Sequence, residues 1–463
     1  MIQGLKPDFV AAFVLADIAI ILVAARLVGG LALRVGQPRV VGEIVSGVLL
    51  GPSVLGPFWF TWGNAPSFLH CDASRAALAV GADPAMAGIP PPSITQCLFP
   101  TQARGVLSIL GSIALIFFMV LVGAELNLSG LATRLKGVLA VALGVVAAPL
   151  VGGLAIGPLL HDPKFALPGA DGMLPDRLGF SLFVAALLAV TAFPVMARIL
   201  QEKNLITSDL GVVGVSAAAL VTVAMFLLTA LARGVASEAS TGSLAKVFVG
   251  TALYLLAMAI PVRLLLGRTI GGAIEARGAI TGTELAVVGV VALGSAYAAD
   301  RIGIHVIVGG FVAGAVLPAR GIIHRELAAR LADITNVILL PIFLAFSGLR
   351  TDFTTLRGQH IVGLVLVLVV GILTKWAAGA AAARIGGLSW NEGLVLGALM
   401  NCRGLLVLVV GILAVDSGIF TPQMQLAGVV MALVTTAMTG PLVDRSVAAV
   451  GTPAPDPARV GAA

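Results

Sequence analysis

The chain has 463 residues, of which 59% are hydrophobic and only 11% are charged. A soluble domain carries about a quarter charged residues, so this composition excludes a water-soluble enzyme with a charged shell. The formal net charge of +6 comes from Lys and Arg residues that stand singly in short loops, so it does not indicate a nucleic-acid partner. We predict an all-α polytopic membrane protein that is embedded in the lipid bilayer.

Apolar stretches recur along almost the whole chain, and a membrane helix needs roughly 20 such residues. We predict about thirteen transmembrane helices, at 9–28, 40–56, 106–124, 137–160, 178–200, 210–233, 247–265, 284–300, 303–319, 334–350, 361–384, 393–415 and 424–443. This prediction divides the chain into the first two spans (1–56), a long loop (57–105), the remaining membrane domain (106–443) and a short tail (444–463). The first stretch lacks a basic n-region and a cleavage site, so we expect it to be retained as a span.

Lys and Arg residues are unevenly divided between the two sides of the predicted membrane. If the N-terminus lies outside, the cytoplasmic segments carry the larger share, as the positive-inside rule requires. We therefore predict a multi-pass protein of the cell (plasma) membrane, with the N-terminus outside and the C-terminus in the cytoplasm.

The long loop 57–105 falls on the outer side in this topology and contains Cys71 and Cys97. Two cysteines in one extracytoplasmic loop can form a disulfide, whereas free thiols are the alternative in a reducing host. We expect the disulfide. The third cysteine, Cys402, lies inside a predicted span and has no evident partner.

Two predicted spans are interrupted near their middle. Pro194 interrupts the fifth, and Asn401 and Arg403, followed by a glycine, interrupt the twelfth. Proline lacks an N–H and frees carbonyls at mid-depth, where they can coordinate cations. A single break is also tolerated in ordinary membrane helices. The fifth and twelfth spans correspond if spans 1–6 and 8–13 are two inverted repeats, which places a site where the interrupted helices meet.

Charged residues inside the bilayer are costly and are functional by default. Lys375 lies well inside the eleventh span, so it is either a proton carrier or one partner of a structural ion pair. Arg403 stays protonated and can compensate the partial charges of broken helix ends. Glu43, near the inner end of the second span, can pair with Arg39 or balance a charge in the core. Asp300 lies near a span end, where capping or ion pairing is expected.

Several segments carry recognisable motifs. They include Gln-Pro-Arg-Val-Val-Gly-Glu-Ile at 37–44, Leu-Val-Gly-Ala-Glu-Leu at 121–126, Thr-Ala-Phe-Pro-Val-Met-Ala-Arg at 191–198, Gly-Ile-His at 303–305, Leu-Pro-Ile-Phe at 340–343 and Met-Asn-Cys-Arg-Gly-Leu at 400–405. These motifs resemble the monovalent cation/proton antiporters, in the branch of plant cation/H+ exchangers and bacterial glutathione-gated potassium effluxers. The resemblance implies the sodium/proton antiporter fold, with a core of crossing interrupted helices, a dimerisation domain and thus a homodimer. It also implies elevator-like exchange of Na+ or K+ for protons.

The sixth span departs from the pattern that the resemblance implies. In such antiporters this span carries an Asn-Asp, Gln-Asp or Asp-Asp pair, whose last aspartate binds the cation and the proton in competition. Here Val221 and Thr222 stand at the pair, and no acidic residue occurs between positions 210 and 233. Lys375 matches a lysine that faces this site in some relatives, so here it loses its carboxylate partner.

Three functions fit this combination. In the first, cation/proton antiport persists: Thr191, Thr222 and freed carbonyls bind the ion, Lys375 titrates, and Glu43 or Asp300 contributes a distant carboxylate. In the second, the fold moves another small solute, such as an anion or an organic molecule. In the third, it is a non-transporting accessory or biosynthetic membrane protein. We favour the first because the rest of the family pattern is kept.

Enzyme motifs are absent from the sequence. No phosphate-binding loop follows a strand, and neither an H-E-x-x-H zinc motif nor a nucleophile elbow occurs. We therefore predict a transporter, not an enzyme, without a cofactor or a metal centre.

Overall fold

The computed structural model describes residues 7–56, 94–124, 134–192, 195–196, 199–200, 205, 208–236, 241–271, 281–318 and 330–450. Within these ranges the chain is almost entirely helical, and its extended pairing is limited to a single bridge between Ala166 and Phe420. The predicted all-α class is confirmed.

The helices follow one another along the chain, with π-helical turns after α11 and before α17. Their bounds are α1 Pro7–Arg34, α2 Arg39–Leu50, α4 Ile94–Leu98, α5 Thr101–Ala124, α7 Leu135–Leu160, α8 Arg177–Ala189, α10 Asp209–Ala236, α11 Thr241–Ala257, α12 Arg263–Leu266, α14 Gly282–Ile302, α15 Val306–Ala315, α17 Leu340–Leu349, α18 Gly358–Ile385, α19 Trp390–Met400, α20 Leu405–Asp416 and α21 Pro422–Val450.

Helical residues occupy every one of the predicted span ranges. Nine helices of the described chain are long and apolar enough to cross a membrane, and the shorter apolar helices include α8, α15 and α20. The number of thirteen crossings stays a prediction. Several boundaries differ from the predicted ones. The helices α1 and α21 continue to Arg34 and Val450, beyond the predicted 28 and 443, and α5 begins at Thr101, before the predicted 106. The helix α2 already ends at Leu50, before the predicted 56.

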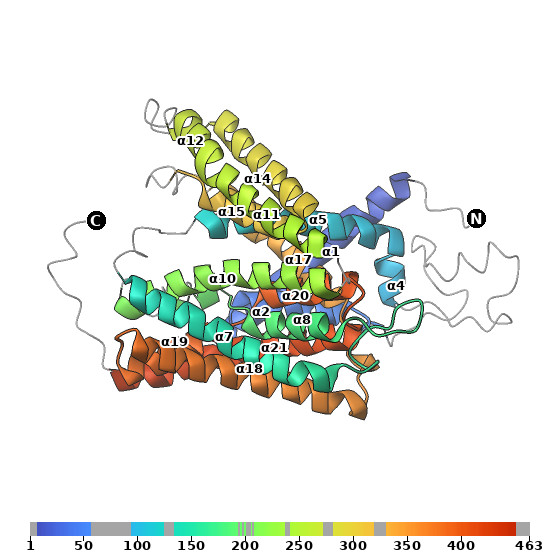
Figure 1. The fold of residues 1–463 in the computed structure, drawn as a ribbon. Coiled ribbons are helices and arrows are strands. Elements are labelled where there is room, and N and C mark those ends of the chain that lie inside the picture. The colour runs from blue at the N-terminus through green and yellow to red at the C-terminus, as the bar shows by residue number, and fades with distance from the viewer. Residues whose placement is uncertain are drawn as a thin grey trace, which may run out of the picture.

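The helices pack in two groups (Figure 1). The core bundle consists of α7, α8, α10, α18, α19, α20 and α21, which lie side by side in one slab. The scaffold bundle consists of α1, α2, α5, α14, α15 and α17. The segment from α11 to α12 contacts α14 of the scaffold and α10 of the core. Each bundle thus combines three spans from the first predicted repeat with three from the second.

Glycine allows the close helix contacts that hold such bundles together without a hydrophobic driving force in lipid. Gly348 of α17 lies against α2, where a Cβ atom would stand 2.6 Å from the carbonyl oxygen of Ile44. A larger residue at this position would push the two helices of the scaffold bundle apart.

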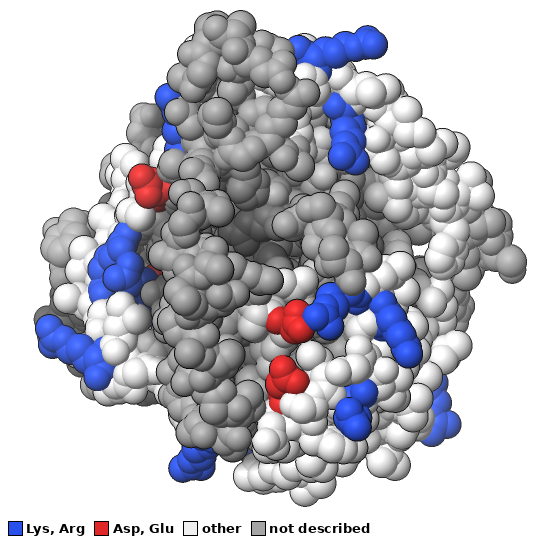
Figure 2. All heavy atoms as spheres, turned by 90° about the vertical axis from the view of Figure 1, so that its left-hand side faces the viewer, with Lys and Arg blue, Asp and Glu red and all other residues white. Residues whose placement is uncertain are grey.

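The beginning of α1 and the end of α21 lie at opposite ends of the molecule (Figure 1). Figure 2 views the end at which α21 finishes, and Lys and Arg predominate there over Asp and Glu. A cationic end is the one expected in the cytoplasm. The predicted orientation agrees with this distribution and stays a prediction.

Candidate ion site at the helix crossing

The first interruption follows α8. This helix starts at Asp176, whose carboxylate accepts a hydrogen bond from the Gly179 amide at 2.8 Å, and it ends at Ala189. Val190, Thr191 and Ala192 then continue without helical structure. The break therefore begins ahead of Pro194, which itself lies outside the described residues.

The second interruption separates α19 from α20. Ser389 and Glu392 form a capping box that starts α19, and the helix ends at Met400. Residues 401–404 are not helical, and the helix resumes as α20. Asn401 and Arg403, which the sequence places at the middle of the twelfth span, lie in this break, and both side chains are buried.

The two interrupted segments cross and hydrogen-bond to each other. The amide of Ala192 donates to the carbonyl oxygen of Cys402 at 2.8 Å, and the Thr191 hydroxyl donates to the carbonyl oxygen of Met400 at 3.3 Å. The C-terminal ends of α8 and α19 therefore meet here. Each helix C-terminus is equivalent to about half a negative charge, so the carbonyl oxygens at these two ends are suited to hold cations, while the N-terminus of α20 at the same break carries the opposite partial charge.

Lys375 of α18 places its side-chain amine at this crossing. Its side chain is fully buried, and Nζ donates to the carbonyl oxygen of Val190 at 2.5 Å and to the hydroxyl of Thr191. Among the residues that the structure describes, no carboxylate lies within ion-pair distance of Nζ; the described ion pairs join other residues. Oxygen atoms of the interrupted helix thus surround the amine in place of an acid.

Arg403 is also fully buried. Its Nη2 donates to the carbonyl oxygen of Gly371 at 2.5 Å, and Nη1 lies 2.6 Å from the sulfur of Met431. Among the residues that the structure describes, Nε has no hydrogen-bond partner. The main-chain oxygen of Arg403 accepts a hydrogen bond from the Thr436 hydroxyl. The side chain therefore links the break to α18 and α21 and adds a second buried positive charge.

Gly371, Met431 and Thr436 are partners of the site that the sequence reasoning missed. A Cβ atom on Gly371 would lie 3.1 Å from Nη1 of Arg403 and 2.7 Å from the sulfur of Met431. The available signal was that position 371 precedes Lys375 by one helical turn and so shares its face. The polar run Thr-Thr-Ala-Met-Thr at 435–439, inside an apolar span, was a second signal.

Asn401 and Thr222 are placed differently with respect to the crossing. The amide nitrogen of Asn401 donates to the carbonyl oxygen of Ile372 at 3.3 Å. Its Oδ1 is buried and has no hydrogen-bond partner in the described part of the chain. Thr222 is buried on α10, and its hydroxyl donates to Ala218 of the same helix at 2.9 Å. Asn401 thus has a side-chain oxygen available at the crossing, whereas the Thr222 hydroxyl donates its hydrogen bond within α10.

The two candidate carboxylates belong to the scaffold bundle. Glu43 is buried on α2, and Asp300 is exposed near the C-terminal end of α14. The other residues of the predicted site that the structure describes come from the core bundle. Cys97 is buried in α4, but Cys71 lies outside the described residues, so the disulfide stays a prediction.

Comparison with known proteins assigns the family. Residues 19–447 match the family described as "Sodium/hydrogen exchanger, transmembrane". The chain is 32% identical over 440 residues to Cation/H(+) antiporter 19 of Arabidopsis thaliana, which covers 94% of this chain and 50% of the relative. It is 31% identical over 435 residues to the Na(+)/H(+) antiporter NhaS4 of Synechocystis, and the match covers 93% of this chain and 96% of the relative.

Two further relatives extend the comparison. The K(+)/H(+) antiporter 1 of Saccharomyces cerevisiae is 30% identical over 411 residues, covering 88% of this chain and 43% of the relative. The chain thus spans about half the length of the plant and yeast relatives. The solved structure of the sodium proton antiporter MjNhaP1 from Methanocaldococcus jannaschii has a TM-score of 0.60, with 16% identity, and covers 95% of this chain and 98% of that one. The chain has the antiporter fold and belongs to the sodium/hydrogen exchanger family of membrane proteins.

Proposed function

We propose that this protein exchanges a monovalent cation, Na+ or K+, for a proton across the membrane, and that Lys375 carries the proton. The relatives support the type of reaction, since their names specify Na(+)/H(+) and K(+)/H(+) antiport. They also support a transport role over an enzymatic one. The contacts of Lys375 at the crossing support the assignment of the proton carrier.

The position of the Lys375 amine carries this proposal. Its ammonium group is held by the oxygens of Val190 and Thr191, in the way that a small cation would be. Release of the proton removes the positive charge and frees these oxygens. Met400 and Asn401 add a carbonyl and an unpartnered amide oxygen at the same crossing. Protonated lysine and metal ion would therefore compete for one set of oxygens.

Neutral oxygens can hold a dehydrated monovalent cation, as the carbonyl rings of potassium channels demonstrate. At the crossing, the C-terminal ends of α8 and α19 each supply the equivalent of about half a negative charge, which the N-terminus of α20 partly offsets. This helix-end charge would take over part of the role of the carboxylate that the sixth span lacks. A charged Lys375 would oppose the cation, so the ion binds only after the proton has left.

The exchange would be electroneutral. In one loaded state the site holds a protonated Lys375, and in the other it holds a neutral lysine and one monovalent cation. The net charge of the site is the same in both states. One proton is therefore exchanged for one cation.

We further propose that the protein lies in the cell (plasma) membrane as a homodimer, with its N-terminus outside and its C-terminus in the cytoplasm. The cationic end in Figure 2 supports this orientation. Family resemblance supports the dimer. Cysteine labelling of an introduced site in the loop after α7, such as Met173→Cys, tests the orientation in intact cells.

The direct test uses proteoliposomes with an acidic lumen and a pH-sensitive dye. Addition of Na+ or K+ outside should dissipate the pH gradient in vesicles that contain the protein and not in empty vesicles. If neither Na+ nor K+ dissipates the pH gradient between pH 6 and pH 9, the proposal is wrong.

An anionic solute is the second candidate. Lys375 and Arg403 are both fully buried, and no ion pair between described residues neutralises either of them. Two such cations would attract a small carboxylate or an inorganic anion. Thr222→Asp separates the candidates, because a new buried carboxylate on α10 should strengthen cation binding and weaken anion binding. If the variant changes neither flux, an accessory role without transport is favoured.

A further inference from the structure

The core and scaffold bundles are joined by a polar contact at one end of the molecule. Arg350 follows the last residue of α17 in the scaffold bundle, and Asp416 is the last residue of α20 in the core bundle. Nη2 of Arg350 lies 2.9 Å from Oδ1 of Asp416. We refer to these two residues as the inter-bundle ion pair.

Other ion pairs between described residues do not join the bundles. Arg134 and Asp209 connect the beginnings of α7 and α10, both in the core. Lys164 and Asp162 lie in the loop between α7 and α8, also in the core. Among the ion pairs whose two residues are both described, the pair of Arg350 and Asp416 is therefore the one that connects the two bundles.

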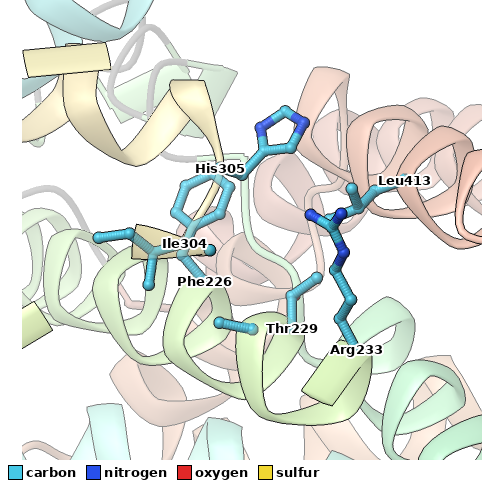
Figure 3. Close-up of a pocket in the computed structure, with 8 residues that line it drawn as sticks. Phe226, Thr229, Arg233, Ile304, His305 and Leu413 are labelled. Atoms are coloured by element: carbon cyan, nitrogen blue, oxygen red, sulfur yellow. The ribbon is translucent and has the colours of Figure 1, made fainter. Parts of the chain in front are cut away.

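A pocket lies between α10 and α20 of the core and the turn from α14 to α15 of the scaffold. In Figure 3, Arg233 extends from α10 toward Leu413 of α20, and His305 lies near the same opening. Leu413 precedes Asp416 by one helical turn.

His305 lies on the scaffold side of this pocket. Its φ of 78° is the left-handed conformation, which non-glycine residues rarely adopt, and its ring accepts a hydrogen bond from the amide of Ile307 at 3.4 Å. Gly303, with φ of 100°, ends α14 two residues earlier.

We propose that the inter-bundle ion pair holds the two bundles in the arrangement seen in this structure and must open for the core to move. The link between this ion pair and the exchange of cations rests on the proposed function, whereas its effect on the arrangement of the two bundles does not. The side chains are 31% and 54% exposed, and ion pairs of such exposure bias an equilibrium by about two- to fivefold. The pair therefore adjusts the population of the two arrangements and does not lock either one.

Pulsed electron spin resonance tests the inference without any transport measurement. Spin labels on Met173→Cys in the core and Arg301→Cys in the scaffold report the distance between the bundles at this end. Arg350→Gln and Asp416→Asn should each increase the population of a second distance by about two- to fivefold. The exchanged pair Arg350→Asp with Asp416→Arg should restore the parental distribution. The chain without introduced cysteines gives the labelling background.

Arg134→Gln is the matched control, because it breaks an ion pair of similar exposure inside the core bundle. It should leave the distance distribution unchanged. Unchanged distributions in Arg350→Gln and Asp416→Asn, or no restoration in the exchanged pair, would overturn the inference. If no variant transports cations but the distances respond as expected, the proposed function fails while the inter-bundle ion pair stands.

Discussion

The amide of Ala192 donates a hydrogen bond to the carbonyl oxygen of Cys402 across 2.8 Å, although the two residues belong to different predicted repeats. This bond joins the two interrupted helices and brings their C-terminal ends together. The Lys375 amine comes from α18 and donates a hydrogen bond to the carbonyl oxygen of Val190 in one of the joined segments. The crossing thus combines helix-end carbonyls with one titratable amine and, in the part of the chain described by the structure, no paired acid.

Lys375→Arg should abolish exchange. Arginine keeps its proton throughout the physiological range, so it would hold the oxygens of Val190 and Thr191 permanently and could not release a proton. We expect a loss of at least about 100-fold in the exchange rate, a size typical for removal of an essential acid–base group. Lys164→Arg, in an exposed loop, should exchange like the parent protein. Thermal melting in detergent would show whether Lys375→Arg is still folded; a folded variant with parental exchange would exclude Lys375 as the carrier.

Thr191→Val should weaken the apparent affinity for the cation. The hydroxyl of Thr191 contacts the Lys375 amine and is a proposed cation ligand, and loss of one such interaction costs about 1.4 kcal/mol, or about tenfold in KM. Thr222→Val is the matched control, since its hydroxyl bonds within α10, and it should change KM by less than about twofold. Equal effects of both substitutions would place the ion at the sixth span instead.

Much of this architecture was predictable from the sequence, because membrane helices need long apolar runs and proline interrupts them. The break near Thr191 and the buried position of Lys375 follow from those two rules. The contact between Lys375 and Val190 could not be predicted from the sequence, because it joins residues 185 positions apart and depends on how α18 packs against α8. The packing of Arg403 on Gly371 and Met431 likewise depends on how α18 and α21 come together; the helical spacing places Gly371 on the face of Lys375 but does not identify Arg403 as its neighbour.

Gly371→Ala should destabilise the protein. The added Cβ would meet both Arg403 and the sulfur of Met431, and overpacking of this kind costs about 1–3 kcal/mol. Gly289 of α14 has open space at the corresponding atom, so Gly289→Ala should stabilise its helix by up to about 1 kcal/mol. Melting of the two variants in detergent should therefore shift in opposite directions. A stabilised Gly371→Ala would contradict the tight packing around Arg403.

Exchange should not respond to the membrane potential. The site carries the same net charge with a protonated Lys375 as with a neutral lysine and one cation. A potassium diffusion potential of either sign, set with valinomycin, should leave the Na+-driven pH change unaltered. A rate that rises with one polarity and falls with the other would require a second charge, for example one on Glu43.

Competition between proton and cation at Lys375 is the central claim, and its most direct test is the pH dependence of exchange at several Na+ or K+ concentrations. If one proton and one cation compete for the same oxygens, a tenfold higher cation concentration moves the midpoint on the acidic side by about one pH unit toward lower pH. A midpoint that stays at the same pH across cation concentrations would show that Lys375 and the ion do not share a site.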